Sequence, residues 1–227
     1  MVRPMGAWTD WILTGRQTLP RVGTVLRNLK PTLHLDDMRA LDAAFIAAHD
    51  VRGIIWDIDG TLMPNHAGEV HAEFVDAFRT LVQHPALKHV IVSNSGETRF
   101  VELSNIFPKI PVLRAYRTDA GVRFRKLLDG KETWTGAASE VSSLRVIKKP
   151  DAALVEFAVR ELGLESLDHA IMVGDQYFTD IAGANLAGVR SVKVETLHRH
   201  SFTFPVRLFQ RTEAVLYRVL HGRPEHG

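Results

Sequence analysis

Two carboxylates stand two residues apart in the segment Asp57-Ile-Asp59-Gly60-Thr61, which closes a short, isoleucine-rich run at 52–58. Side chains at i and i+2 of an extended chain point the same way, so both acids can enter one crevice. Gly60 permits a sharp exit from the strand. Burying two acids is costly, and a divalent cation beside them would offset the cost. The alternative for this motif alone is a polar strand end whose acids cap a helix.

A second pair of acids, Asp175 and Asp180, lies in VGDQYFTDI. Asp175 ends an apolar run, and Asp180 lies near the start of the helix expected after it. Acids near a helix start often interact only with the helix dipole. Together with Asp57 and Asp59, they predict an oxygen-lined site suited to Mg²⁺.

Ser93 and Asn94 end a further apolar run at 88–94. A hydroxyl and free backbone N–H groups at a strand-to-helix turn can hold phosphate oxygens, although such residues are also common in turns. The pair Lys148-Lys149 offers a cation at the next expected strand end. A solvated pair before a helix is the alternative for at least one of these lysines.

Short apolar runs alternate along the chain with stretches of helical spacing. The runs lie at 52–58, 88–94, 111–116, 169–175 and 190–196, and the clearest helical stretches lie at 69–84 and 153–162. Strands that are apolar throughout are buried on both faces, and their alternation with helices predicts an α/β fold with a parallel sheet. Function in such folds gathers beyond the carboxyl ends of the strands, where the polar residues above would meet.

These motifs, in this order, resemble those of the haloacid dehalogenase (HAD) superfamily of hydrolases over about residues 50–196. The resemblance implies a three-layer Rossmannoid fold with a central parallel sheet. It also implies that Asp57 attacks phosphorus and forms an aspartyl phosphate, and that Asp59 protonates the leaving oxygen and later activates water. Ser93 and Lys149, or Lys148 in its place, would hold the transferring phosphoryl group.

The same resemblance implies a Mg²⁺ ion bound by Asp57, the backbone carbonyl of Asp59, and Asp175. Supporting positions would be Gly60, Thr61, Asn94, Lys148 and Asp180. Little room for a cap domain exists between the motifs, so we expect a capless or minimally capped fold. An open crevice cannot enclose a small ligand, but it can receive a phosphate presented by a lipid headgroup, a protein or a nucleic-acid end.

A closer resemblance is to the YqeG-type HAD family, which includes bacterial and mitochondrial phosphatidylglycerophosphate phosphatases. It is carried by LKPTLHLDDM (29–38), RGIIWDIDGTL (52–62), VGDQYFTDIAGANLAGVRSVKV (173–194) and RTEAVLYRVL (211–220). This implies dephosphorylation of phosphatidylglycerophosphate to phosphatidylglycerol. The chain departs from the family at Gly60, where asparagine is usual, and by an insertion at about 117–145, expected to be a hairpin or a mobile loop.

The charge distribution divides the 227 residues into three parts. Residues 1–31 carry a net charge of +4 and residues 196–227 one of +3, which leaves −5 for the middle. We expect a basic, tryptophan-containing extension at 1–31, a catalytic domain at 32–196 and a basic helical extension at 197–227. An acidic body with basic ends is unlike a nucleic-acid-binding protein and suits peripheral contact with an anionic membrane. Solvated arginines are the plainer alternative.

The chain has no cysteine, which excludes disulfides and thiol chemistry. It has no apolar run long enough to span a bilayer and no secretory signal pattern, so we expect a cytoplasmic protein, peripheral on the inner face of the membrane. No feature indicates an oligomeric state. Two other functions stay open: a soluble phosphatase for a sugar phosphate, nucleotide or phosphoprotein, and a non-enzymatic binding or scaffold module on the same fold.

Overall fold

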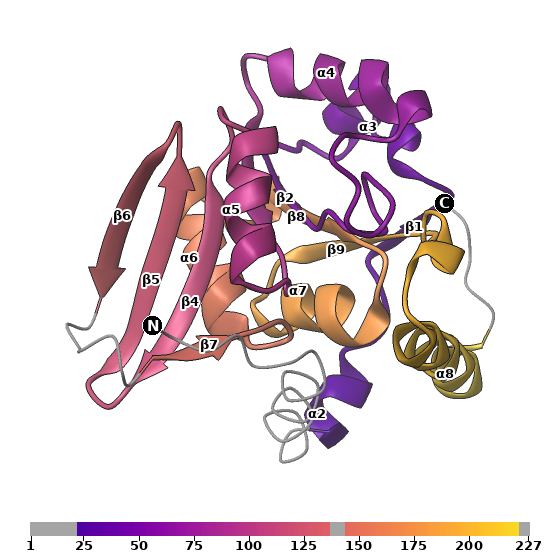
Figure 1. The fold of residues 1–227 in the computed structure, drawn as a ribbon. Coiled ribbons are helices and arrows are strands. Elements are labelled where there is room, and N and C mark those ends of the chain that lie inside the picture. The colour runs from indigo at the N-terminus through magenta and orange to yellow at the C-terminus, as the bar shows by residue number, and fades with distance from the viewer. Residues whose placement is uncertain (1–21, 137–143, 223–227) are drawn as a thin grey trace.

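A computed structural model describes residues 22–136 and 144–222, which are built around one mixed sheet (Figure 1). The strands are β1 (Leu33–Leu35), β2 (Gly53–Trp56), β3 (Lys88–Val92), β4 (Val112–Thr118), β5 (Gly121–Leu128), β6 (Lys131–Gly136), β7 (Arg145–Ile147), β8 (Ala170–Gly174) and β9 (Arg190–Val194). The helices are α2 (Val22–Arg27), α3 (Ala43–Ala48), α4 (Val75–Gln83), α5 (Glu97–Ile106), α6 (Ala152–Leu162), α7 (Ala182–Leu186) and α8 (Phe204–His221).

The strand order is β1-β9-β8-β2-β3-β4-β5-β6, and β7 pairs with β4. The six strands from β1 to β4 in this order are parallel, whereas β5, β6 and β7 pair antiparallel. Each of the five apolar runs overlaps one of the parallel strands, so the α/β fold with a central, mostly parallel sheet is confirmed. The short strand β1 was not among the predicted runs.

The central strand β2 shows how the sheet divides the core into two layers. Ile54 and Trp56 pack in the cluster that contains residues of α3, α4 and α5, and Ile55 packs in the cluster of α6 and α7. All four residues of the strand are buried. Helices therefore cover both faces of the sheet, which explains why β2 is apolar throughout rather than alternating.

The bounds of the two predicted helical stretches agree with the structure to different degrees. Helix α6 starts after Asp151, whose carboxylate accepts a hydrogen bond from Ala153 N, and ends at Gly163 with a left-handed φ of 58°. The stretch expected from residue 69 instead enters a 3₁₀ turn at 72–74 and becomes α-helical only at Val75. Its buried positions Phe74, Phe78 and Leu81 are nonetheless those that the spacing predicts.

Most of the insertion at about 117–145 continues the sheet. Strands β5 and β6 form a hairpin that adds to β4 at the edge seen on the left of Figure 1, and residues 137–143 lie outside the described residues. On the other side of the molecule stands α8 (Figure 1). The tryptophans predicted for a membrane interface, Trp8 and Trp11, also lie outside the described residues. None of the helices in the described ranges is both long and apolar enough to cross a bilayer.

Candidate active site

The predicted site residues meet because three parallel strands end at the same level. Trp56, the last residue of β2, is paired with Ile91 of β3 and with Val173 of β8. Asp57 follows directly, and its backbone N–H donates to the Val173 carbonyl over 2.9 Å. The strand ends therefore bring Asp57, Ser93 and Asp175 to one edge of the sheet, as the spacing predicts.

Lys149 neutralises part of the charge at Asp57. Its Nζ lies 2.5 Å from Asp57 Oδ1 and 2.7 Å from Asp180 Oδ1, and it donates to the Val92 carbonyl over 2.9 Å. The side chain is 1% exposed and Asp57 is 7% exposed, so the ion pair lies in a low-dielectric environment. Burial lowers the pKa of Lys149, but Asp180 and Asp57 outweigh it and raise that pKa above its ordinary value. The lysine stays charged.

Asn94 fixes the backbone that presents this lysine. Its Oδ1 accepts from Lys149 N over 2.8 Å, and its Nδ2 donates to the Lys149 carbonyl over 3.0 Å. Lys148 is half-buried and does not line the pocket beside Asp57. Of the two lysines between which the sequence left a choice, the structure therefore brings Lys149 to the nucleophile candidate.

Three buried carboxylates, Asp57, Asp175 and Asp180, each offer an oxygen, and these oxygens lie within 4.8 Å of one another. Burial raises the pKa of Asp57 well above its ordinary range, Lys149 lowers it, and the two other acids raise it again. Burial and Asp180 likewise raise the pKa of Asp175 to about 7. Lys149 contacts Asp57 and Asp180, and Lys193 lowers the pKa of Asp175. The three acids still outnumber these two lysines.

The acid cluster fits a hard divalent cation. Asp175 Oδ1 is buried and has no hydrogen-bond partner in the described part of the chain, and the donor set consists of oxygens only, as Mg²⁺ prefers. Asp180, which the sequence placed in a supporting role, joins this cluster. The carboxylate of Asp59 does not belong to it, and ligation through the Asp59 carbonyl stays a prediction.

The Asp59 carboxylate is instead held by a buried arginine, Arg99 of α5. Arg99 Nη2 lies 2.7 Å from Asp59 Oδ1, and Arg99 Nε lies 3.3 Å from Asp59 Oδ2, which gives a two-point contact. His66 N also donates to Asp59 Oδ1 over 3.0 Å. The Arg99 side chain is 3% exposed and that of Asp59 is 13% exposed, so this is a largely desolvated pair at the edge of the pocket.

Two glycines leave the space that the acids occupy. Gly60 has a φ of +93°, and a Cβ there would lie 2.9 Å from both Asp175 Oδ2 and Phe202 Cζ. A Cβ at Gly174 would lie 2.4 Å from the Cβ and Cγ of Asp180. Both values are shorter than real contacts allow, so the close approach of the acids depends on glycine at these two positions.

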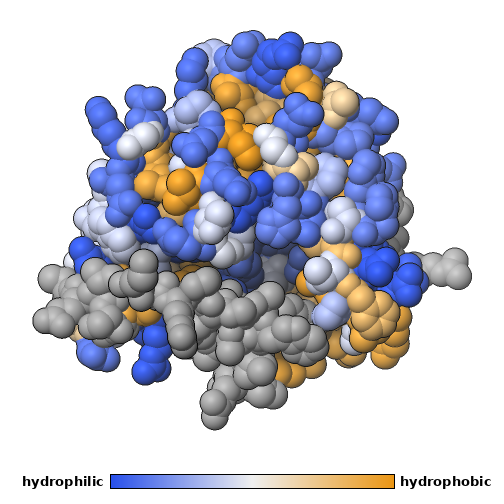
Figure 2. Space-filling model, viewed as in Figure 1, coloured by the Kyte–Doolittle hydropathy of each residue, from blue (hydrophilic) through white to orange (hydrophobic). Residues whose placement is uncertain are grey.

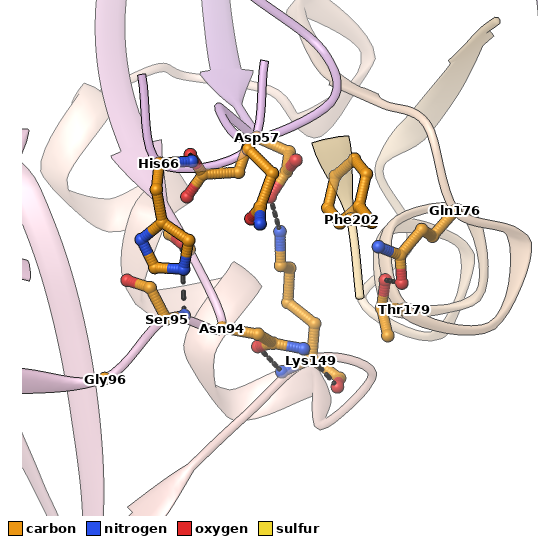
Figure 3. Close-up of a pocket in the computed structure, with 12 residues that line it drawn as sticks. Asp57, His66, Asn94, Ser95, Gly96, Lys149, Gln176, Thr179 and Phe202 are labelled. Atoms are coloured by element: carbon orange, nitrogen blue, oxygen red, sulfur yellow. Dashed lines mark hydrogen bonds and ion pairs between the residues drawn. The ribbon is translucent and has the colours of Figure 1, made fainter. Parts of the chain in front are cut away.

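The pocket in front of Asp57 is open and has a volume of about 190 Å³. Figure 3 shows the Lys149 amine directed at Asp57, with Phe202 and Gln176 on one side and Asn94 on the other. The pocket lining comprises Asp57, Asp59, Asn65, His66, Ser93, Asn94, Ser95, Gly96, Lys149, Gln176, Thr179 and Phe202. Residues 118–136 do not contribute to it, so the β5–β6 hairpin does not form a lid over this site.

The segment after β9 also builds the site, which the sequence did not indicate. Leu197 N donates to the Gly60 carbonyl over 2.7 Å, and Asn65 N donates to Ser201 Oγ over 3.0 Å. Phe202, in the extension expected at 197–227, is buried and lines the pocket. Residues 197–202 are therefore part of the wall of the site.

Helix α8 supports the turn that carries Asp175 through two buried polar residues. Gln210 Nε2 donates to Asp175 Oδ2 over 3.4 Å, and Glu213 Oε2 accepts from Phe178 N over 2.9 Å. Burial raises the pKa of Glu213 to about 8, although its hydrogen bond with Phe178 lowers it. No sequence signal separates these two residues from the other polar residues of α8, such as Arg211 and Thr212.

Two family models match parts of the chain that hold residues of this site. The family model described as mitochondrial PGP phosphatase matches residues 13–106, and the model described as HAD-hydrolase-like matches residues 146–198. The first match contains Asp57 and Ser93, and the second contains Lys149, Asp175 and Asp180. No curated protein is significantly similar to the chain. An uncharacterized protein from Listeria monocytogenes serotype 4b, known as a crystal structure, is 23% identical over 62% of this chain and 76% of that chain, with a TM-score of 0.37.

Proposed function

Because the chain is a phosphatase of the HAD superfamily, of the PGP phosphatase type, we propose that it removes the terminal phosphate of phosphatidylglycerophosphate and leaves phosphatidylglycerol. The observation that carries this proposal is the buried Asp57 carboxylate at the floor of an open pocket, with Lys149 Nζ 2.5 Å away. The described residues add no separate domain above the pocket, which suits a phosphate that projects from a larger surface.

In the first step, an oxygen of Asp57 forms a bond to phosphorus, and the bond between phosphorus and the headgroup oxygen breaks. Asp59 donates a proton to that oxygen, so that the lipid leaves as an alcohol and Asp57 carries the phosphoryl group. Lys149 and the Ser93 hydroxyl hold the phosphoryl oxygens. Such transfers depend mostly on positioning and on neutralising charge.

In the second step, Asp59, now a carboxylate, accepts a proton from a water molecule that attacks phosphorus. The bond between phosphorus and Asp57 breaks, and inorganic phosphate leaves with the water oxygen. The two-point contact with Arg99 holds the Asp59 carboxylate at the pocket edge, which supports its use as the base in this step. The backbone N–H of His66 fixes the same carboxylate oxygen.

A Mg²⁺ ion fits the site and would be held by Asp57, Asp175 and Asp180, with the Asp59 carbonyl as a further ligand. When bound, it would supply positive charge against the phosphoryl oxygens and against the clustered acids. Since the carboxylates outnumber the nearby lysines, we expect activity to depend on this ion.

The test is phosphate release from vesicles that contain phosphatidylglycerophosphate, beside a set of soluble phosphate monoesters, with Mg²⁺ or with a chelator. We expect Mg²⁺-dependent release from the lipid and loss of release in Asp57→Asn. Asp76→Asn is the matched control, because Asp76 is a 93% exposed aspartate on α4. Trapped enzyme should carry an acyl phosphate that hydroxylamine cleaves.

Two results would contradict the proposal. Rapid turnover of one soluble ester without lipid turnover would make the chain a soluble phosphatase. Full activity of the Asp57→Asn protein would remove the aspartyl phosphate from the mechanism.

A further inference from the structure

Helix α8 differs from an ordinary surface helix because two of its three buried residues are polar. Its buried residues are Gln210, Glu213 and Tyr217, two of which contact the turn that carries Asp175. A helix on the surface of a protein normally turns its apolar stripe toward the core. Here the inward face is mixed. Gln210 and Glu213 satisfy polar groups of that turn, while Tyr217 stacks on Tyr177 and Phe209 contacts Phe178. The remaining large apolar side chains of the helix are not all covered by this contact.

Five large apolar side chains of α8 are exposed to solvent. Leu220, 47% exposed, lies on another sector of the helix, and the other four share one sector. Phe204 is 67% exposed, Leu208 53%, Val215 58% and Val219 75%. At 3.6 residues per turn these four residues lie within about 60° of one another around the helix axis. We call this row the apolar stripe. Figure 2 shows apolar side chains gathered at the position of α8. Single exposed apolar residues are common, but four aligned on one side of a helix mark an interaction surface.

Three arginines border the apolar stripe along one side. Arg207, Arg211 and Arg218 lie within about 60° of one another on the adjoining sector of the helix, and we call them the arginine edge. The only acidic residue between Phe204 and His221 is Glu213, which faces inward. The outward face of α8 is thus apolar and cationic without a compensating carboxylate of its own.

The stripe and the edge meet in a hollow of about 110 Å³ near the start of the helix. Its walls are Phe204, Arg207, Leu208 and Arg211, two apolar and two cationic side chains. This combination suits a molecule that presents an anionic group next to hydrocarbon. Phe202, which lines the pocket in front of Asp57, lies only two residues before Phe204, so the hollow adjoins the wall of the active site.

We infer that the outward face of α8 docks on an anionic lipid bilayer, with the apolar stripe in the acyl-chain boundary and the arginine edge at the lipid phosphates. The inference rests on the proposed function, because it explains how a lipid phosphate reaches Asp57. It goes further by assigning the contact to one helix. The inner face of the same helix holds the Asp175 turn, so docking brings the membrane to a fixed side of the site.

The experiment uses the full chain and measures its binding to vesicles of phosphatidylglycerol mixed with phosphatidylcholine, and to vesicles of phosphatidylcholine alone. Leu208→Glu/Val215→Glu puts two charges in the apolar stripe. We expect it to weaken binding to the anionic vesicles by about 100-fold, about tenfold for each buried apolar side chain lost. Val101→Glu is the matched control, because Val101 is 41% exposed on α5, away from the stripe, and should bind as the parent does.

Arg211→Gln and raised ionic strength should each weaken binding to anionic vesicles and leave the weak binding to phosphatidylcholine unchanged. Turnover of a soluble monoester in each variant reports that the active site is intact. Equal vesicle binding by the parent and the Leu208→Glu/Val215→Glu protein would overturn the inference. A second result would also overturn it: a parent protein that is a dimer in solution and a Leu208→Glu/Val215→Glu protein that is a monomer. In that case a second copy of the chain, and not a bilayer, would cover the apolar stripe.

The two proposals fail separately. Vesicle binding through α8, with soluble esters hydrolysed and phosphatidylglycerophosphate left intact, would reject the proposed substrate and keep the docking surface. Hydrolysis of detergent-dispersed phosphatidylglycerophosphate, together with vesicle binding that substitutions in the apolar stripe do not weaken, would keep the proposed substrate and reject the docking surface.

Discussion

Replacing Arg99 with methionine tests whether this arginine acts through Asp59. The substitution keeps much of the side-chain volume beside Met63 and removes both contacts to the Asp59 carboxylate, at 2.7 and 3.3 Å. Loss of one partner from a fully buried pair costs about 3–5 kcal/mol. Since Asp59 is 13% exposed and can gain some hydration, we expect a loss of about 2–3 kcal/mol in unfolding free energy.

The effect on catalysis is bounded by what Asp59 contributes. A positioned general acid and base typically contributes about 10²–10⁴-fold, so Asp59→Asn should lower kcat by that factor. Arg99→Met leaves the carboxylate in place but frees it to turn, so we expect a smaller loss in kcat, about 10–10²-fold, with little change in KM. If Arg99 acts only through the Asp59 carboxylate, replacing Arg99 should not lower kcat further in a protein that already carries Asp59→Asn.

The assay is therefore a double-mutant cycle on kcat, with urea unfolding of each protein measured in parallel. We expect the double variant to lie within about threefold of Asp59→Asn alone, where independent effects would add a further 10–10²-fold. Arg79→Met is the matched control. Arg79 is 59% exposed on α4 and pairs with Asp76 over 3.1 Å, so its loss should change stability by less than about 0.5 kcal/mol. Additive losses in kcat would refute the positioning role.

Three further outcomes are expected. Burial lowers the pKa of His89 from 6.5 to about 4. As the pH falls, the unfolded chain therefore binds a proton at this histidine before the folded protein does. The unfolding free energy should fall by up to about 3 kcal/mol between about pH 6.5 and pH 4. Urea titrations should show this loss in the parent and not in His89→Phe. Gly174→Ala places a Cβ against Asp180, so we expect it to lower the unfolding free energy by about 1–3 kcal/mol and kcat by at least tenfold. Gly23→Ala is the control, because Gly23 has open space around it, and it should change neither quantity. Mg²⁺ should raise the unfolding temperature by neutralising the acid cluster, and Na⁺ at equal ionic strength should not.

The strand-end residues were predictable because their signal is local. Asp57, Ser93 and Asp175 each follow a continuous apolar run, and parallel strands end at a common edge whatever their exact lengths. The choice between Lys148 and Lys149 was not predictable in this way. Neighbouring residues of an extended chain point to opposite sides, so the choice depends on how the chain leaves β7, and the sequence does not specify this.

Residues that act across the fold carry no local signal. Arg99 reaches Asp59 from the first turns of α5, 40 residues along the chain, and nothing in its neighbours separates it from the other arginines. Gln210 and Glu213 were hidden for a different reason. Amphipathic reasoning assigns polar helix positions to solvent, and on α8 those positions face the site. The β5–β6 hairpin was predicted as one of two alternatives, and its pairing with β4 depends on a long-range register.

The contacts of Leu197, Ser201 and Phe202 with the loop after Asp57 also have a consequence for how the enzyme is made. A ribosome releases the Asp57 segment well before the stretch from Leu197 to α8, because about 140 residues separate them. The site wall and the support beneath Asp175 are therefore absent from a nascent chain until the residues from Leu197 through α8 have been made. A message that ends prematurely after β9 would yield a protein containing all four motifs and lacking a finished site.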